Sequence, residues 1–196
     1  MVKPVTDFYD RLSPQYHDNM GWDWEAGMRL EGKNLDRFLS HQIEGTGPYT
    51  LLDCSCGIGT QAIGLALQGY QVHATDLSTV SIDCARQQST NLGVDLTFGV
   101  ADFRKLHESV TDTFDVVLTC DNSIAHCLLD VDLMAMLGSM KSRLKPNGLL
   151  LISLRDYDPL VRDRPRFNNQ HVDDRPDGRR VVFQLWDWKT DGSSYL

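Results

Sequence analysis

The segment Leu51-Leu52-Asp53-Cys54-Ser55-Cys56-Gly57-Ile58-Gly59-Thr60 decides the fold of this 196-residue chain. It starts inside a short apolar strand, expected at residues 49–53, and leads into a helix expected at residues 60–67. The two glycines between them have the spacing of a tight turn. Glycine lets the backbone approach a ligand closely, and the first N–H groups of a helix lack partners within the helix. The segment therefore predicts a strand–turn–helix unit that can bind a ligand at its turn.

Strand and helix patterns continue to alternate after this unit. Ser78 is a plausible N-cap for a helix through about residue 91, and a second helix is expected at residues 133–144, before Pro146-Asn147-Gly148. Further strands are expected at residues 71–75, 95–100, 114–119 and 149–154. This order predicts an α/β, Rossmann-like fold with a mainly parallel sheet and helices on both faces.

The N-terminal part, residues 1–45, is expected to form a helical lid or cap on a ligand-binding domain of residues 46–196. Pro14 should interrupt its first helix. The amphipathic stretch at residues 24–42 places four apolar residues on one predicted buried face: Leu30, Leu35, Phe38 and Leu39. The chain then reads as a single domain with this cap.

The C-terminal part carries weaker signals. Acids and arginines interleave between Arg155 and Arg180, which is typical of a solvated loop. Residues 181–188 are expected to add one more strand to the sheet. Asp191-Gly192 is a hairpin signal, yet only a stub of a return strand follows it. The pattern predicts incomplete C-terminal strands and a truncated sequence.

Composition excludes several classes of function. The net charge of −8 disfavours nucleic acid as a partner, and no apolar run is long enough to span a membrane. Five cysteines, an odd number, suit free thiols in the cytoplasm better than a disulfide framework. Cys54 and Cys56 do not indicate a metal site, because no second Cys or His pair has ligand spacing.

Two further acids follow the second and third expected strands. Asp76 lies 17 residues past Gly59, where a carboxylate can hydrogen-bond both hydroxyls of a ribose, and Asp102 is placed to reach an adenine amino group. The alternative is a doubly wound domain in which these acids only cap helices. A dinucleotide-binding oxidoreductase is disfavoured, because Ala62 stands where its third glycine is expected, and no Gly-Lys-Ser/Thr of a phosphate loop follows the first strand.

With this set of residues, the chain resembles the class I S-adenosylmethionine-dependent methyltransferases over residues 49–155. The resemblance assigns cofactor contacts to Asp53, Gly57, Gly59, Asp76 and Asp102, together with their neighbours Leu77, Phe103 and Cys120. Ser55 departs from the family pattern, since the first glycine of the turn usually stands there. The family also places an N-terminal arginine on the methionyl carboxylate, and Arg29 is the nearest candidate.

The segments after the fourth and fifth strands resemble the glycine/sarcosine N-methyltransferase subgroup. They read Asn122-Ser123-Ile124-Ala125-His126 and Arg155-Asp156-Tyr157-Asp158, and the Asn/Asp-Pro-Pro-aromatic motif of nucleobase amino methylation is absent. The resemblance implies that Arg155 clamps a substrate carboxylate and Asn122 orients the amine. Tyr16 and Tyr157 would supply oxygens around the methyl group or the carboxylate.

The resemblance implies an enzyme that methylates a small amine or amino acid, leaves S-adenosylhomocysteine as product, and is compatible with a homo-oligomer. Methylation of oxygen or sulfur in another small molecule stays an alternative, as does cofactor binding without turnover. Arg155 has the alternative of a surface ion pair with Asp156 or Asp158, and Tyr16 that of lid packing.

Overall fold

The computed structural model describes residues 2–16, 23–176 and 178–192. Backbone contacts divide the chain into two compact units. The first unit comprises Met1–Pro14 and Trp24–Leu154, and the second comprises Gln15–Asp23 and Arg155–Leu196. Whether residues 1–45 act as a lid on residues 46–196 stays a prediction, because backbone contacts do not show which part moves.

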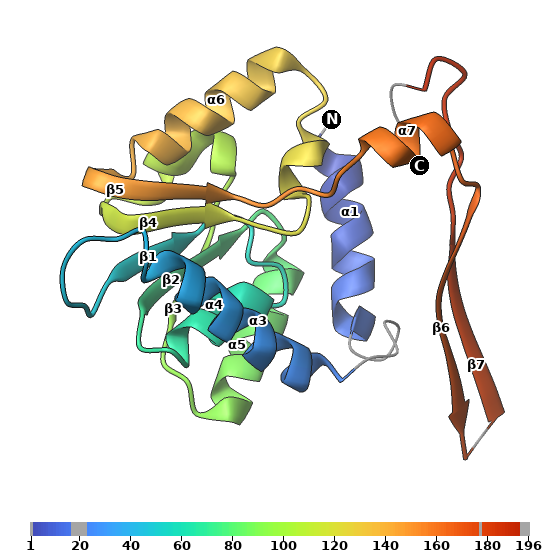
Figure 1. The fold of residues 1–196 in the computed structure, drawn as a ribbon, viewed down its shortest axis with the longest axis horizontal. Coiled ribbons are helices and arrows are strands. Elements are labelled where there is room, and N and C mark those ends of the chain that lie inside the picture. The colour runs from blue at the N-terminus through green and yellow to red at the C-terminus, as the bar shows by residue number, and fades with distance from the viewer. Residues whose placement is uncertain (1, 17–22, 177, 193–196) are drawn as a thin grey trace. The chain divides into compact units, whose positions relative to one another are not determined.

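The first unit is built on a five-stranded sheet in the order β3-β2-β1-β4-β5, and every neighbouring pair is parallel (Figure 1). Its strands are β1 (Thr50–Asp53), β2 (Gln71–Asp76), β3 (Thr97–Val100), β4 (Phe114–Thr119) and β5 (Leu144–Ile152). The strand order reverses beside β1, so β1, β2 and β4 all end where the turn after β1 lies. This confirms the predicted α/β class and the parallel sheet.

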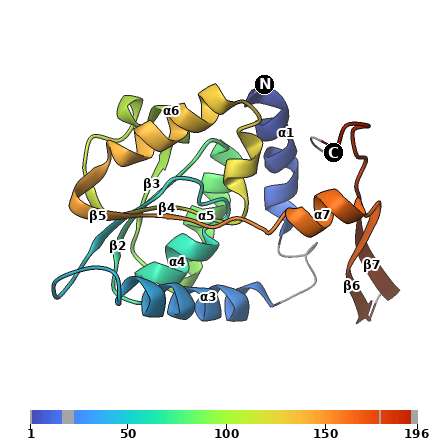
Figure 2. The same ribbon diagram turned by 45° about the horizontal axis from the view of Figure 1, so that its top comes forward.

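Helices cover both faces of the sheet because successive strand residues point to opposite sides. Leu51 of β1 packs with Leu39 and Leu65 in one core, whereas Leu52 packs with Met136 and Met140 in the other. Figure 2 shows α6 and the helices α3 and α4 on opposite sides of the strands. The bounds are α1 (Val2–Leu12), η1 (Ser13–Gln15), α3 (Trp24–Leu39), α4 (Thr60–Ala66), α5 (Thr79–Leu92), η2 (Phe103–Glu108), η3 (Ser123–His126) and α6 (Asp130–Lys141).

The buried face of α3 agrees with the predicted one at Leu39, which is buried, and at Leu35, which packs against the same core, but it differs at two other positions. Leu30 is 61% exposed and Phe38 is 54% exposed, while Met28, Gly32 and Leu39 are buried. The reason is a close helix–helix contact: a Cβ added at Gly32 would lie 2.3 Å from the carbonyl oxygen of Gly64 in α4. Apolar periodicity did not reveal this contact, because glycine contributes nothing to an apolar stripe.

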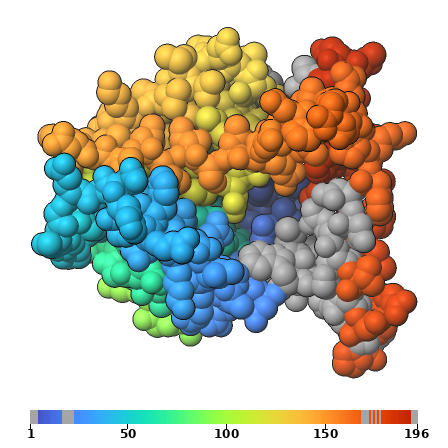
Figure 3. All heavy atoms as spheres, viewed as in Figure 1, coloured from blue at the N-terminus to red at the C-terminus, as the bar shows by residue number. Residues whose placement is uncertain are grey.

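The junction between α6 and β5 also differs from the prediction. The helix ends at Lys141 and the strand already begins at Leu144, so Pro146 lies inside the strand. β5 is an edge strand, and its register against β4 shifts between Phe114 and Val116. Proline is tolerated there because Pro146 is not among the residues that pair with β4, so no hydrogen bond between strands needs its N–H. In the space-filling view the β5 residues (orange) and α3 (blue) lie on the visible surface (Figure 3).

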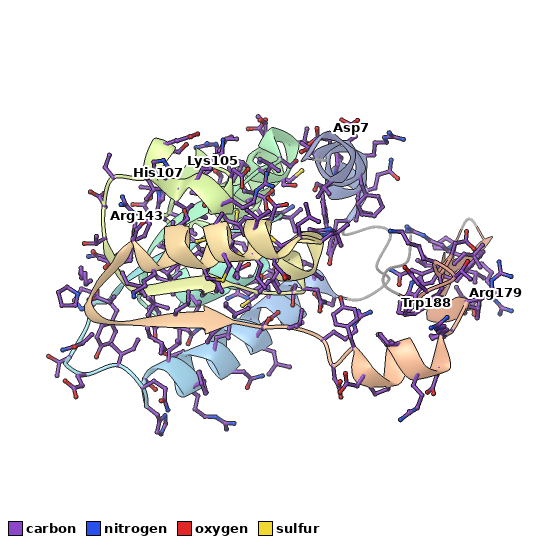
Figure 4. The ribbon with its side chains drawn as sticks, turned by 90° about the horizontal axis from the view of Figure 1, so that it is seen from above. Asp7, Lys105, His107, Arg143, Arg179 and Trp188 are labelled. Atoms are coloured by element: carbon purple, nitrogen blue, oxygen red, sulfur yellow. The ribbon has the colours of Figure 1, made fainter. Side chains whose placement is uncertain are left out.

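The second unit corrects two expectations about the C-terminal part. Residues 155–180 are not a plain loop: they contain α7 (Asp158–Asp163) and β6 (Phe167–Arg175), and β7 (Gly178–Leu185) pairs antiparallel with β6. The predicted strand at residues 181–188 therefore belongs to this two-stranded sheet and not to the parallel one. Interleaved charges fit a hairpin because they pair across it, as Arg179 (labelled in Figure 4) does with Asp174 at 2.7 Å.

A turn signal for this hairpin is present in the sequence. Arg175-Pro176-Asp177-Gly178 has the proline, aspartate and glycine of a tight turn, and Gly178 has a φ of 138°. The expected return strand after Gly192 falls on residues 193–196, which lie outside the described residues. Within the described part of the chain, no helix has both the length and the apolar character needed to cross a membrane.

We predict that Gly32→Ala lowers the free energy of unfolding by about 1–3 kcal/mol, because the added methyl group overpacks the contact with Gly64. Gly138→Ala is the matched control, since nothing lies within 4 Å of its added Cβ in α6. Alanine is the better helix former, so this control should be neutral or up to about 1 kcal/mol more stable. Urea denaturation measures both, and equal effects would contradict the close contact.

Candidate active site

The turn after β1 is shaped by two glycines with positive φ angles. Gly57 has a φ of 54° and Gly59 a φ of 94°, values that residues with side chains rarely adopt. A Cβ at Gly59 would lie 2.8 Å from Ile63 and 3.2 Å from Ala85, whereas a Cβ at Gly57 would meet nothing within 4 Å. Gly59 is thus required by packing, and Gly57 leaves open space beside the turn.

Asp76, at the end of β2, fixes this turn from the neighbouring strand. One carboxylate oxygen accepts from the backbone N–H of Gly57 at 2.8 Å, and the other accepts from Ser78 at 2.9 Å. Burial raises the pKa of Asp76 although these hydrogen bonds act to lower it, and nearby Asp10 raises it further. Asp10 itself, on α1, accepts from the hydroxyl of Ser78 at 2.5 Å. The two strand ends and α1 are therefore linked through one carboxylate and its N-cap serine.

Asp53, at the end of β1, is a buried carboxylate that is only half satisfied. Its Oδ1 accepts from the backbone N–H of Ser55 at 3.1 Å, and its Oδ2 has no hydrogen-bond partner. Burial raises its pKa to about 8, and the negative charges of Asp76, Asp121 and Glu31 add to the effect. A carboxylate that is buried and unpaired is costly, which marks it as a candidate for contact with a ligand.

The side chain of Gln61 connects two further acids beside the turn. Its amide nitrogen donates to Glu31 on α3 at 3.0 Å and to Asp121 after β4 at 2.7 Å. Burial raises the pKa of Glu31, and the charge of Asp121 contributes to the shift. Gln61 is buried, Glu31 is half-buried and Asp121 is exposed, so the three groups run from the interior to the surface.

Asp102, after β3, is held by an arginine two residues further on. Arg104 makes side-chain contacts to both carboxylate oxygens, the shortest at 2.6 Å, and its backbone N–H donates to Oδ1 at 2.9 Å. A second acid, Asp132 on α6, holds the other end of the guanidinium at 2.9 Å. Burial acts to raise the pKa of Asp102, but the hydrogen bonds from Arg104 outweigh it and the pKa is lowered. Asp102 is therefore ionised and fixed beside Phe103.

The loop after β4 has an unusual backbone. Asp121 and Asn122 both have positive φ angles, 55° and 69°, and Asn122 caps η3. Strained positions of this kind cluster at functional sites. His126 ends η3, and its Nε2 lies 3.0 Å from the hydroxyl of Tyr9 on α1. Loss of solvent around the ring lowers the pKa of His126.

The end of β4 contacts the turn after β1 and is followed by a buried thiol. The hydroxyls of Ser55 and Thr119 lie 2.6 Å apart, which joins the glycine turn to the end of β4. Burial raises the pKa of the neighbouring Cys120 thiol to about 12, so the thiol stays protonated at neutral pH. Leu77, half-buried, separates Asp76 from Ser78.

The structure therefore brings together the predicted residues at the carboxyl ends of β1, β2, β3 and β4 in the first unit. These are Asp53, Ser55, Gly57, Gly59, Asp76, Leu77, Asp102, Phe103, Cys120 and Asn122. Arg29 is also in this unit, on α3, where it is exposed and pairs with Glu25 at 2.7 Å. Glu31 and Gln61 were missed, because they lie in helices and no motif in the sequence marks them.

Three predicted residues belong to the second unit. Arg155 is exposed, and its guanidinium carbon lies 5.7 Å from the ring centre of Trp186 in a cation–π arrangement. Tyr157 precedes α7 and Tyr16 follows η1, and both are half-buried. Their roles toward a ligand stay predictions.

A groove of about 510 Å³ lies at the opposite, amino edge of the same sheet. The first residues of four strands line it: Thr50, Gln71, Thr97 and Phe114. It lacks the glycine turn and the strand-end acids, so it does not compete with the carboxyl edge as the candidate site. In open parallel sheets, ligands collect at the carboxyl edge where the strand order reverses.

We predict that Asp53→Asn changes stability in a pH-dependent way. The pKa of Asp53 is about 8 in the folded chain and about 3.9 in the unfolded chain. Its contribution to the free energy of unfolding is therefore fully present below the unfolded pKa and is lost as the pH rises through the folded pKa. The variant should therefore gain stability relative to the wild type between pH 5 and about 8. Urea denaturation at several pH values measures this difference.

Asp115→Asn serves as a control of opposite sign, because hydrogen bonds from Thr50 and Lys145 lower the pKa of Asp115 despite its partial burial. The ionised Asp115 stabilises the fold at neutral pH, and this effect is lost as the pH falls. The Asp115→Asn variant should therefore lose the most stability, relative to the wild type, at neutral pH. A pH-independent difference for Asp53→Asn would contradict the raised pKa.

Comparison with known proteins agrees with this geometry. Residues 51–148 match the family model described as a methyltransferase domain. The glycine/sarcosine N-methyltransferase of Parasynechococcus marenigrum is 29% identical over 82% of this chain and 52% of its own length. A ubiquinone biosynthesis O-methyltransferase of Xanthomonas axonopodis pv. citri is 31% identical over 72% of this chain and 58% of its own length.

The crystal structure of DesVI from Streptomyces venezuelae shares the fold, with a TM-score of 0.72 at 17% identity, over 91% of this chain and 70% of that one. The chain spans about half the length of the curated relatives that it matches. The family model covers half of the chain, and its residues include the glycine turn and the strand-end acids. The chain belongs to the class I S-adenosylmethionine-dependent methyltransferases.

Proposed function

We propose that this chain forms the catalytic part of an enzyme that transfers the methyl group of S-adenosylmethionine to the nitrogen of a small amine or amino acid of the glycine or sarcosine kind. The observation that carries the proposal is the turn at Gly57, held by Asp76 and left open beside the half-satisfied carboxylate of Asp53. The choice of nitrogen is supported by the Asn122-to-His126 loop and by relatives named as glycine/sarcosine N-methyltransferases.

The strand-end residues fit the parts of this cofactor. Asp76 would accept from the ribose hydroxyls, since each of its oxygens has a further lone pair beyond the backbone hydrogen bonds. Asp102, ionised and fixed by Arg104, would accept from the adenine amino group beside Phe103 and Leu77. Gly57, Gly59, Ser55 and Cys120 would line the methionyl part. Arg29 would reach the methionyl carboxylate only by leaving Glu25, an exposed pair that holds it weakly.

The bound cofactor would supply an electrophilic methyl group, so the protein needs to position the acceptor and exclude water. Arg155 would bind the acceptor carboxylate with its forked donors, and Asn122 would orient the amine. Tyr16 and Tyr157 would place oxygens near the methyl group or the carboxylate. The buried thiol of Cys120 is protonated and would take no part as a nucleophile.

Methylation of oxygen in a different small molecule is the second candidate. It is favoured by the relative named as an O-methyltransferase, which is 31% identical over 144 residues. Cofactor binding without turnover is a third reading. An assay of methyl transfer from labelled S-adenosylmethionine to glycine, sarcosine, dimethylglycine and a phenol distinguishes all three.

The proposed setting follows from chemistry of the same residues. The cysteines Cys54, Cys56, Cys84, Cys120 and Cys127 are all free, which suits a reducing cytoplasm. The proposed acceptor is a small molecule and not nucleic acid, given the net charge of −8. Assembly into a homo-oligomer is part of the proposal, and light scattering tests it.

We predict that Gly57→Ala weakens binding of S-adenosylhomocysteine about tenfold or more, because the methyl group enters the space beside the turn. Alanine at the positive φ of Gly57 should also lower the free energy of unfolding by about 1–2 kcal/mol. Gly93→Ala is the matched control: its φ is 65°, its Cβ also meets nothing within 4 Å, and it caps α5 away from the turn.

Calorimetric titration and urea denaturation of both variants separate strain from binding. We expect the two variants to lose similar amounts of stability, and only Gly57→Ala to bind S-adenosylhomocysteine more weakly. Equal affinities in the two variants would place the cofactor elsewhere.

We predict that Arg155→Lys lowers kcat/KM for sarcosine about tenfold to a hundredfold while S-adenosylhomocysteine affinity changes little, since lysine keeps the charge but loses the fork. Arg162→Lys is the control, because Arg162 lies in the same segment but pairs with Asp163 at the surface. Unchanged acceptor kinetics in Arg155→Lys and Arg155→Ala would exclude the carboxylate clamp and favour a neutral acceptor.

A further inference from the structure

One side of α6 is apolar and exposed. Val131 is 71% exposed and Met134 is 66% exposed, and Ala135 and Gly138 are exposed as well. Within the described residues, nothing lies within 4 Å of a Cβ added at Gly138. Figures 1 and 2 both show α6 on the outside of the first unit. These four residues are called the outer face of α6 below.

The outer face is continuous, and the opposite side of the helix is already in use. Its members lie three or four residues apart, so they share one side of α6. On the other side Met136 and Met140 are buried in the core, and Ser139 accepts from the backbone N–H of Leu106 at 2.8 Å. Single exposed apolar residues are common on proteins, but a continuous apolar face marks an interaction site. A helix that is apolar on both sides is normally buried on both.

The charges of α6 lie at its two ends and indicate the kind of partner. Asp130 begins the helix and Lys141 ends it, and both are exposed. Among the described residues, neither makes an ion pair. They are about three helical turns apart, so both fall on the side of Met134. The remaining charge, Asp132, lies on the inner side and is held by Arg104.

A second copy of this chain has the complementary pattern. When two α6 helices lie antiparallel about a twofold axis, Asp130 of each helix faces Lys141 of the other. The same register brings Met134 beside Gly138 of the second copy, where the space over the glycine accommodates the longer side chain. We propose that the chain forms a symmetric dimer in which the outer faces of two α6 helices pack antiparallel.

Other partners fit this face less well. Helices that lie on anionic membranes are rich in lysine and arginine, whereas α6 has a single basic residue and the chain has a net charge of −8. A different protein would need to match Asp130 and Lys141 separately, while a second copy matches both at once. A pair of 12-residue helices is smaller than most stable interfaces, so we expect a dissociation constant of about 1–100 μM.

This inference deepens the proposed function, because it names the surface of the proposed homo-oligomer and rests on that part of the proposal alone. The outer face contains none of the strand-end residues of the candidate site. Variants of this face should therefore keep their affinity for S-adenosylhomocysteine.

Sedimentation velocity of the whole chain, at concentrations between about 1 and about 300 μM, measures the dimer. Met134→Glu should weaken it about tenfold or more, because a carboxylate would be buried in an apolar contact. Leu30→Glu is the matched control, since Leu30 is a similarly exposed apolar residue on α3, outside the outer face. This control should dimerise like the wild type.

Charge reversal tests the antiparallel register. Asp130→Lys and Lys141→Asp each place like charges opposite one another at both ends of the pair, so each should weaken self-association about tenfold. The double variant should dimerise like the wild type, and so should an equimolar mixture of the two single variants. Circular dichroism of each variant monitors folding, because both reversals oppose the helix dipole.

A wild-type chain that stays monomeric at every concentration would overturn the inference, and so would unchanged dimerisation of Met134→Glu. Failure of both the double variant and the mixture to restore the dimer would overturn it too. A lower free energy of unfolding for Met134→Glu, measured where the wild type is monomeric, would show that another part of the chain covers the face, which is a further contradiction.

The outcomes also separate this inference from the proposed catalysis. A dimer that follows the charge reversals would support the inference even if the chain bound no S-adenosylhomocysteine, and the proposed catalysis would then fail alone. Methyl transfer by a chain that is monomeric at every concentration would overturn the inference and leave the proposed catalysis in place.

Discussion

The hydrogen bond from the backbone N–H of Gly57 to the carboxylate of Asp76 is the interaction on which the candidate site depends. It ties the turn after β1 to the end of β2, and the second oxygen of Asp76 holds the start of α5 through Ser78. A charge-assisted hydrogen bond to the backbone fixes a turn that glycine alone would leave adaptable. The space beside Gly57 is thereby kept open at the point where the strand order reverses.

The buried acids at this edge lower the stability of the fold but form a site for a ligand. Burial raises the pKa values of Asp53, Asp76 and Glu31, so the fold carries carboxylates whose charged form is disfavoured. Asp102 differs, because hydrogen bonds from Arg104 lower its pKa despite burial, and Asp132 holds the other end of the Arg104 guanidinium. This edge of the sheet thus provides one ionised acceptor beside η2, and beside α3 a group of acids in which burial raises the pKa of Asp53 and Glu31.

The sheet and the strand-end residues were predictable because each depends on local patterns. Apolar runs such as residues 114–119 mark buried parallel strands, and acids or glycines directly after them fall at the carboxyl edge by topology alone. The buried face of α3 could not be fully predicted, because Gly32 contacts Gly64 only by having no side chain, and glycine adds nothing to an apolar pattern. Glu31 was missed for a related reason: its partner Gln61 is 30 residues away, and only the packing of α3 on α4 brings them together. The β6–β7 hairpin was misread because charges that pair across strands look, in sequence, like a solvated loop.

A backbone amide NMR titration with S-adenosylhomocysteine tests the location of the site most directly. The account predicts that resonances of Gly57, Gly59 and Asp76 shift as the ligand is added. Residues of the groove at the opposite edge, such as Gln71 and Thr97, should keep their positions. Shifts confined to that groove, or none in a folded and saturated sample, would contradict a cofactor site at the carboxyl edge.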